Sequence, residues 1–215
     1  ETSVCNLASI GLSKFVKEDK TFNYEHLHEI TKIVTENLNK VIDINFYPTE
    51  KTRVSNLNHR PIGIGVQGLA DVFAMMDIPF ESDEAKQVNK QIFETIYHAA
   101  LEMSNELSIQ ESYINYDLPG YYSSFEGSPI SQGIFQFDMW GVTPSNRYNW
   151  QSLRENITNH GIRNSLLLSP MPTASTSQIL GNNECFEPFT SNIYIRRTLA
   201  GEFVIVNKYL MKDFQ

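Results

Sequence analysis

Cysteine, basic charge and long apolar runs are all scarce in this sequence, and each shortage argues against a class of protein. Two cysteines, Cys5 and Cys185, occur among 215 residues, which is too few for a disulfide framework and is typical of a reducing cytosol. The formal net charge of −8 disfavours a nucleic-acid partner, because such partners are bound through basic patches. No stretch resembles a membrane span, and the first residues lack a signal-peptide pattern. We therefore expect a cytoplasmic protein with no membrane partner.

The remaining composition is that of a globular protein. Hydrophobic residues make up 41% and charged residues 20% of the chain, and its length allows one sizeable core. We expect a single domain over residues 1–215. Tyr, Ser, Gly and Pro gather between Tyr113 and Gly133, which predicts a long surface loop and a lineage-specific surface insertion at about 111–133.

Apolar spacing predicts helices that alternate with strands. Helices are expected over 23–45, 68–76, 82–107 and 151–159, where apolar residues recur on one face. Strands are expected over 2–10, 162–168, 191–196 and 202–206. Residues 49–58 are interpreted as a polar connection. This alternation indicates an α/β architecture.

The segment from Ile162 to Asn183 is the most informative part of the chain. A strand that is expected to bury Leu166, Leu167 and Leu168 is followed by a corner stiffened by Pro170 and Pro172. The hydroxyl-rich run Thr173, Ala174, Ser175 and Thr176 comes next. The first turn of a helix offers unpaired backbone N–H groups, and flanking hydroxyls add donors, so this run suits a phosphate. The alternative is an ordinary helix N-cap, which uses the same residue types.

Two further patterns carry weaker signals. Gly63 to Gly68 forms a literal G-x-G-x-x-G with Asp83 downstream, but a dinucleotide site requires a hydrophobic strand immediately before it. We expect these glycines to allow close backbone packing instead, and an NAD-dependent oxidoreductase is the disfavoured alternative. Glu25, His26, His28 and Glu29 are interpreted as a solvated helical face, so no metal site is predicted.

Several long segments resemble the large, catalytic subunit of class I ribonucleotide reductase of the eukaryotic type. PMPTAST followed by QILGNNE resembles that family's substrate-phosphate loop, and SVCNLASI, LNKVIDINFYP, HRPIGIGVQGLADVF and TSNIYIRRTLAGEF follow the family's order. Its large-subunit signature is matched at Trp150, Leu153, Gly161, Ile162, Arg163, Asn164, Leu168, Ser169 and Pro172.

The resemblance implies a fold and a chemistry. The fold would be the C-terminal half of a ten-stranded α/β barrel, and the activity would be reduction of ribonucleoside diphosphates to deoxyribonucleoside diphosphates by thiyl-radical chemistry. Thr173, Ala174, Ser175 and Thr176 would bind the substrate diphosphate. Cys5 would be one thiol of the redox pair, with its partner upstream of the chain, and Cys185 a packing residue. The family's Asn-x-Cys-x-Glu radical motif would lie upstream of the SVCNLASI segment, whereas the only such string in this sequence, Asn183 to Glu187, follows the phosphate loop. We therefore expect a fragment that is inactive alone.

Partners and cofactors follow from the same resemblance. The whole enzyme would depend on a radical-generating di-iron small subunit, respond to ATP and dNTP effectors, form a homodimer of large subunits and be re-reduced by thioredoxin or glutaredoxin. No cofactor is expected on this segment itself. The alternative from another class is a non-catalytic phosphate-binding or assembly module that uses the same helix start without a redox thiol.

Overall fold

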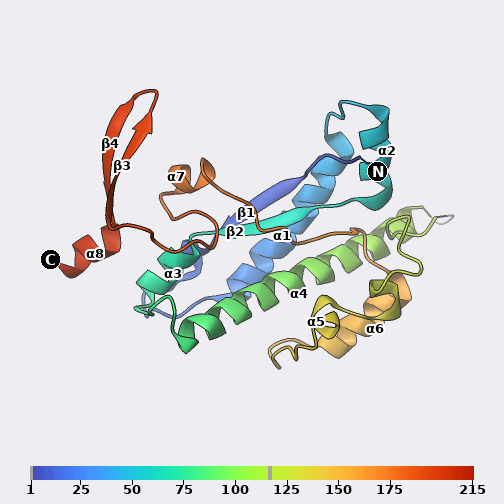
Figure 1. The fold of residues 1–215 in the computed structure, drawn as a ribbon. Helices are drawn as coiled ribbons and strands as arrows, with labels where there is room; N and C mark the ends of the chain where they lie inside the picture. The colour runs from blue at the N-terminus through green and yellow to red at the C-terminus, as the bar shows by residue number, and fades with distance from the viewer. Residues whose placement is uncertain (1, 116–117) are drawn as a thin grey trace.

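The computed structural model describes residues 2–115 and 118–215 and arranges them as helices around short strands (Figure 1). The strands are β1 (Leu7–Gly11), β2 (Gly63–Gln67), β3 (Ile193–Thr198) and β4 (Gly201–Val206). The α-helices are α1 (Tyr24–Ile44), α2 (Glu50–His59), α3 (Leu69–Met75), α4 (Asp83–Ile114), α5 (Gln136–Met139), α6 (Trp150–His160), α7 (Thr176–Leu180) and α8 (Lys208–Asp213). Two 3-10 turns, η1 (Leu12–Phe15) and η2 (Ile130–Gln132), complete these elements.

A parallel strand pair lies at the centre of the molecule. β1 and β2 pair from Leu7 opposite Gly63 to Gly11 opposite Gln67. A parallel pair needs a crossover connection, and here α1 and α2 supply it. Helix α1 also packs along α4, so the two longest helices lie side by side beneath the strands (Figure 1).

The segment 162–168 runs alongside β2, on the side away from β1. The N–H groups of Ile62 and Ile64 donate to the carbonyl oxygens of Leu166 and Leu167 at 3.0 and 2.8 Å, and Ile64 forms a parallel bridge with Leu168. The expected regular strand is therefore only an extended segment with one bridge. The expected burial of the three leucines is also wrong in part, because Leu166 is 64% exposed.

The long helices begin where local chemistry predicts. The side chain of Ser82 accepts a hydrogen bond from the N–H of Ala85 at 3.1 Å, and the side chain of Asn23 accepts from the N–H of His26 at 3.1 Å. Such caps satisfy backbone donors that the first helical turn leaves open. The predicted starts of α1 and α4 are confirmed.

Three sequence-based assignments need correction, and one strand, at 63–67, is not predicted from the sequence. Residues 49–58 are helical, because Thr49 and Thr52 form a reciprocal capping box at the start of α2. The glycine-rich run at 63–67 is a fully buried strand. The first strand begins at Leu7 rather than Thr2. The predicted loop from Tyr113 begins inside α4, and it buries Tyr122 and Phe125 in the core.

The proposed insertion at 111–133 stays a prediction, and its residues 116–117, like residue 1, lie outside the described residues. A single domain over 1–215 also stays a prediction.

The C-terminal strands form a separate antiparallel hairpin. The sequence predicts the two strands, and they pair from Ile193 opposite Val206 to Thr198 opposite Gly201. The hairpin projects from the rest of the chain in Figure 1. The α/β class is thus confirmed. Within the described residues the two sheets have two strands each and no closed barrel forms.

Candidate phosphate-binding loop and thiol

The loop at 173–176 lies near the carboxyl ends of β1 and β2. A side-chain Cβ placed on Gly11 or on Gly68 would meet atoms of Asn182 at 3.6 and 3.1 Å, which puts the turn after α7 against both strand ends. The backbone N–H of Leu69 donates to the carbonyl of Cys185 at 3.4 Å. Ligands of open parallel sheets commonly bind at this end of the strands.

The backbone of the loop leaves donors free. The N–H of Ser177 donates to the carbonyl of Thr173 at 2.9 Å, which closes the first turn. Across the described part of the chain, by contrast, the N–H groups of Ala174, Ser175 and Thr176 find no protein acceptor. All three residues are exposed. The helix start therefore presents three free donors to the surface, as an anion site requires.

The ordinary N-cap interpretation does not fit this geometry. Ser175 occupies the N-cap position of α7, but its side chain makes no capping hydrogen bond. Thr173 is buried, and its hydroxyl accepts from the N–H of Cys185 at 2.8 Å. The hydroxyls of the loop consequently leave the helix start uncapped and open to a ligand.

Asp71 anchors the far side of the loop. Its buried carboxylate accepts from the N–H of Asn183 at 2.6 Å and from the hydroxyl of Tyr209 at 2.7 Å. Burial, together with the hydrogen bond to this carboxylate, raises the pKa of Tyr209 well above its usual value, so its hydroxyl remains a donor. Lys208 also lies 3.5 Å from Asp71. These contacts join α3, the turn after α7 and α8.

Several buried polar atoms near the loop have no hydrogen-bond partner among the described residues. They are the hydroxyls of Ser9 and Ser177 and the side-chain oxygens of Gln67 and Asn182. These four residues form two hydrogen-bonded pairs. The side-chain N–H of Gln67 donates to the carbonyl of Ser9, and the backbone N–H of Asn182 donates to the carbonyl of Ser177. Buried polar groups normally have partners. Their concentration at the strand ends marks a place where an outside partner would be accommodated.

Cys5 precedes the amino end of β1, whereas the loop lies near the carboxyl end of that strand. Its neighbours are fixed on both sides, since Val4 exchanges two hydrogen bonds with the side chain of Asn56 at 2.9 and 2.8 Å, and the carbonyl of Asn6 accepts from the N–H of Gly63 at 2.9 Å. The thiol itself is exposed. Cys185 is buried, and burial raises its pKa, which agrees with the packing role expected of it.

The glycines at 63 and 65 serve close packing. A Cβ at Gly63 would lie 2.5 Å from a methyl of Leu7 and 2.9 Å from the Cβ of Ser169, and one at Gly65 would lie 3.2 Å from the Cα of Pro170. They belong to a strand and not to a strand-to-helix turn, so the dinucleotide fingerprint lacks its context. The expected packing role is confirmed.

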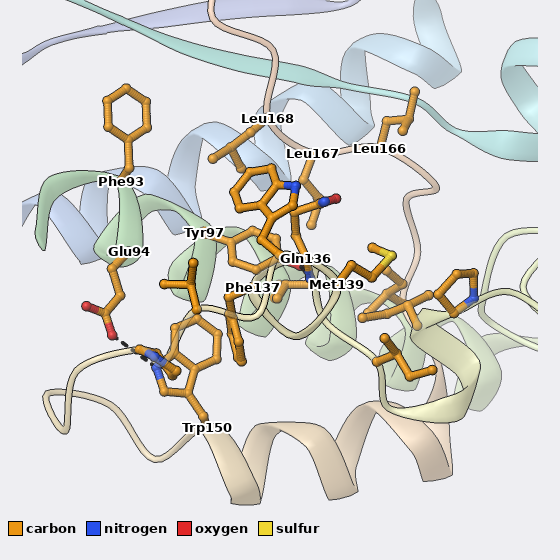
Figure 2. Close-up of a pocket in the computed structure, with 18 of the residues that line it drawn as sticks. Phe93, Glu94, Tyr97, Gln136, Phe137, Met139, Trp150, Leu166, Leu167 and Leu168 are labelled. Atoms are coloured by element: carbon orange, nitrogen blue, oxygen red, sulfur yellow. Dashed lines mark hydrogen bonds between the residues drawn. The ribbon is translucent and has the colours of Figure 1, made fainter. Parts of the chain in front are cut away.

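A cavity of about 710 Å³ lies elsewhere. It is placed between α4, α6 and the segment 166–168 (Figure 2). Its walls are mostly apolar, and Leu166, Leu167 and Leu168 form one of them. Glu94, on its rim, accepts from the indole N–H of Trp150 at 3.2 Å. Such a lining does not suit a diphosphate, so we place the candidate anion site at the loop.

The family comparison agrees with these features. The family model described as ribonucleotide reductase, barrel domain, matches residues 1–215. The chain belongs to this family. It is 59% identical over 213 residues to the ribonucleoside-diphosphate reductase large subunit of Caenorhabditis elegans and 59% identical over 213 residues to the large chain of Schizosaccharomyces pombe. It is 55% identical over 232 residues to the large subunit of Arabidopsis thaliana.

The chain corresponds to a part of these reductase relatives. Each of the three alignments covers 99% of this chain, but only 26%, 25% and 28% of the respective relative. The chain therefore spans about a quarter of their length. In the described residues, no helix combines the length and apolarity that a membrane span requires.

The residues in and around the loop at 173–176 are only partly predicted from the sequence. The loop itself is predicted from its prolines and hydroxyls, but Asp71 and Tyr209 are missed, because they are 138 positions apart. Asn164, which belongs to the matched signature, is fully buried and bonds Asn39, Arg60 and Ser104. Its role in this structure is architectural.

The predicted solvated face on α1 is also only partly correct. His26 and Glu29 form an exposed pair at 3.4 Å. His28, however, turns inward and meets His98 of α4 at 2.9 Å. Periodicity along α1 could not reveal this contact, because its other half lies 70 residues away.

Proposed function

We propose that this chain is the C-terminal portion of the catalytic barrel of a ribonucleoside-diphosphate reductase large subunit. The observation that carries the proposal is the 59% identity to named large subunits across 99% of the chain. The reaction would convert a ribonucleoside diphosphate into its 2′-deoxy product for DNA precursor synthesis. The described residues would supply two parts of the site, a diphosphate cradle and one reducing thiol.

The cradle is assigned to Thr173, Ala174, Ser175 and Thr176. Three free backbone donors and the positive end of the α7 dipole face the surface there. Rigid backbone donors hold a ligand in a fixed geometry more closely than flexible ammonium groups do. The unpartnered Ser177 and Asn182 oxygens nearby support a site whose polar partners come from a ligand or its water.

Cys5 is assigned to the redox pair. In the balanced reaction two thiols become one disulfide and release two electrons and two protons, while the substrate 2′-hydroxyl leaves as water and hydrogen takes its place at C2′. A thiol in this role must be reachable by its partner and by an external reductant, and the Cys5 side chain is exposed. By the family resemblance, the partner thiol is assigned to a cysteine upstream of residue 1, and the buried Cys185 is assigned a packing role.

The other assignments rest on the family resemblance. They are a radical-generating di-iron small subunit, a homodimer of large subunits, ATP and dNTP effectors, thioredoxin or glutaredoxin as reductant, and a cytoplasmic location. By the resemblance, the radical Asn-x-Cys-x-Glu motif lies upstream of the SVCNLASI segment, and the string at Asn183 to Glu187 lies downstream of it around the buried Cys185. Residues 1–215 by themselves are therefore expected to be inactive. The exposed Leu166 beside β2 suits a sheet to which the rest of a barrel would add strands.

The decisive experiment compares Cys5→Ser with Cys185→Ser in the full-length protein. Reduction of a ribonucleoside diphosphate is followed with the small subunit and a thioredoxin recycling system. Cys5→Ser is expected to abolish turnover while diphosphate binding stays normal, and Cys185→Ser should leave most of the activity. Normal turnover by Cys5→Ser would remove the redox assignment. The phosphate-binding module would then be the better description of this segment.

A further inference from the structure

Two histidines and a glutamate converge where α1 packs on α4. The Nε2 atom of His28 lies 2.9 Å from Nδ1 of His98 and 3.7 Å from a carboxylate oxygen of Glu102. Each of the three residues offers one ligand atom, and these atoms all lie within 4.8 Å of one another. His98 and Glu102 are four residues apart on α4, so one helical face presents both.

The two imidazoles are held in place by aromatic rings. Tyr148 stacks on His98 with ring centroids 4.3 Å apart and on His28 at 5.4 Å. Trp150 meets the edge of the His98 ring at 4.9 Å, and the hydroxyl of Tyr148 hydrogen-bonds to Thr95 at 2.8 Å. Ligands that are locked by packing lose little freedom on binding.

The distances match the edges of a metal tetrahedron. Zinc binds imidazole nitrogen and carboxylate oxygen at about 2.0–2.2 Å, so two ligands of a tetrahedral ion lie roughly 3.3 Å apart. The observed separations of 2.9 and 3.7 Å bracket that value. We propose that His28, His98 and Glu102 form a divalent transition-metal site, best suited to Zn²⁺, with the fourth position open to water.

The surrounding charges permit this ligand set. Burial lowers the pKa of His28 and takes the pKa of His98 down to about 4, so both rings are neutral at neutral pH, the form that binds a metal. Lys32 competes for Glu102 at 3.0 Å, but it has a closer partner in Glu106 at 2.6 Å. Glu102 can therefore turn toward an ion without leaving Lys32 unpaired.

A metal at this point would act as a clamp between two helices. His28 is 70 positions from His98 in sequence, and an ion bound by both would tie the start of α1 to the middle of α4. Binding to the folded state alone raises stability. This role is separate from the proposed reductase chemistry, so either assignment can fail without the other.

The test measures Zn²⁺ binding by the full-length protein, previously treated with chelator, in competition with a chromogenic chelator. The variants are Glu102→Gln, His98→Phe and, as a control, His26→Gln, which changes an exposed histidine of α1, the helix that carries His28. The unmodified protein and the control should take up one more equivalent of tightly bound Zn²⁺ than the two ligand variants. Zn²⁺ should also raise the melting temperature of the unmodified protein and of His26→Gln, but not that of Glu102→Gln or His98→Phe.

Cobalt distinguishes this site from adventitious thiol binding. Co²⁺ in a nitrogen and oxygen tetrahedron gives weak visible bands without the strong thiolate charge-transfer band that Cys5 or Cys185 would produce. Glu102→Gln keeps Lys32 paired and should fold normally, which circular dichroism checks. Equal Zn²⁺ uptake by the unmodified protein and a folded Glu102→Gln would overturn the proposal, as would Co²⁺ bands of thiolate type that persist in both variants.

Discussion

At the scale of single residues, the two thiols have opposite environments. Cys5 is exposed, whereas Cys185 is 5% exposed and adopts a left-handed backbone conformation with φ of 44°. Burial raises the pKa of Cys185, which reduces the fraction of reactive thiolate at a given pH. Cys5 should therefore react much faster with a thiol-modifying reagent than Cys185.

Alkylation of the native protein at pH 8 tests this contrast. Iodoacetamide is expected to modify Cys5 at least about tenfold faster than Cys185, since Cys5 is exposed, whereas burial limits access to Cys185 and lowers its thiolate fraction. Peptide mass spectrometry over a time course gives both rates in one sample. In urea the difference should disappear. Comparable rates in the folded protein would show that Cys185 is not protected.

A second residue-scale prediction concerns the backbone donor at Ser175. Ser175→Pro removes one N–H from the proposed cradle, while Ser175→Ala keeps the N–H and removes only the hydroxyl. Losing a hydrogen bond to a charged group costs about 1.5–3 kcal/mol, so Ser175→Pro should weaken nucleoside diphosphate binding at least tenfold. Ser175→Ala should weaken it less. Calorimetry on the full-length protein measures both, and unchanged affinity in the proline variant would contradict the cradle assignment.

At the scale of elements, a buried polar network joins α1, the end of α2, α4 and the segment after α6. The amide of Asn164 exchanges hydrogen bonds with Asn39 at 2.9 and 3.0 Å and accepts from the hydroxyl of Ser104 at 2.9 Å. Arg60 donates to Asn39 and forms a two-point ion pair with Asp43 at 2.7 and 3.0 Å. This network fixes where the 162–168 segment meets β2.

Removing the central amide should therefore be costly. Asn164→Ala leaves several buried donors and acceptors unpaired, and an unpaired buried group costs about 1–3 kcal/mol, so we expect a loss of about 3 kcal/mol in the free energy of unfolding. Asn159→Ala, at an exposed position of α6, is the control and should change stability by less than about 0.5 kcal/mol. Urea denaturation followed by circular dichroism gives both values. A loss below that of the control would rule out a supporting role for the network.

The same elements show what sequence could and could not predict. α1 and α4 are predicted because their caps and apolar faces are local signals. α2 is missed because its buried residues are polar, Thr52, Ser55 and Asn56, and give no apolar stripe. β2 is missed because glycines alternate along it, and the burial of these glycines is explained only by the neighbouring segments that carry Leu7 and Ser169.

The candidate site divides in the same way. The loop at 173–176 is predicted because proline, hydroxyl and helix-start signals lie within a few residues. The free N–H groups of Ala174, Ser175 and Thr176 depend on how the backbone enters α7, which residue type alone does not predict. Contacts such as Tyr209 with Asp71 and His28 with His98 join residues 138 and 70 positions apart, so no local pattern contains them.

At the scale of the whole molecule, the β3–β4 hairpin presents an uncovered apolar face. Ile195 pairs with Val204 across the hairpin, and both are exposed, by 60% and 64%. Ile193 and Val206 pair at the open end of the hairpin and are exposed by 62% and 40%. Contiguous apolar surface and unpaired strand edges favour association with another chain. In a complete barrel other parts of the protein would compete for this face.

The isolated 215-residue chain should consequently self-associate through the hairpin. Sedimentation velocity over a range of concentrations is expected to show a rise in average mass that Ile195→Thr/Val204→Thr suppresses, since threonine keeps the β-branched shape and removes apolar surface. Ile44→Thr, which changes an 82% exposed side chain at the end of α1, is the matched control and should leave association unchanged. If the double variant associates as strongly as the unmodified chain, the contact lies elsewhere, and the outer edge of the 162–168 segment becomes the next candidate. A chain that stays monomeric at every concentration would instead mean that neither the hairpin face nor the sheet edge drives self-association.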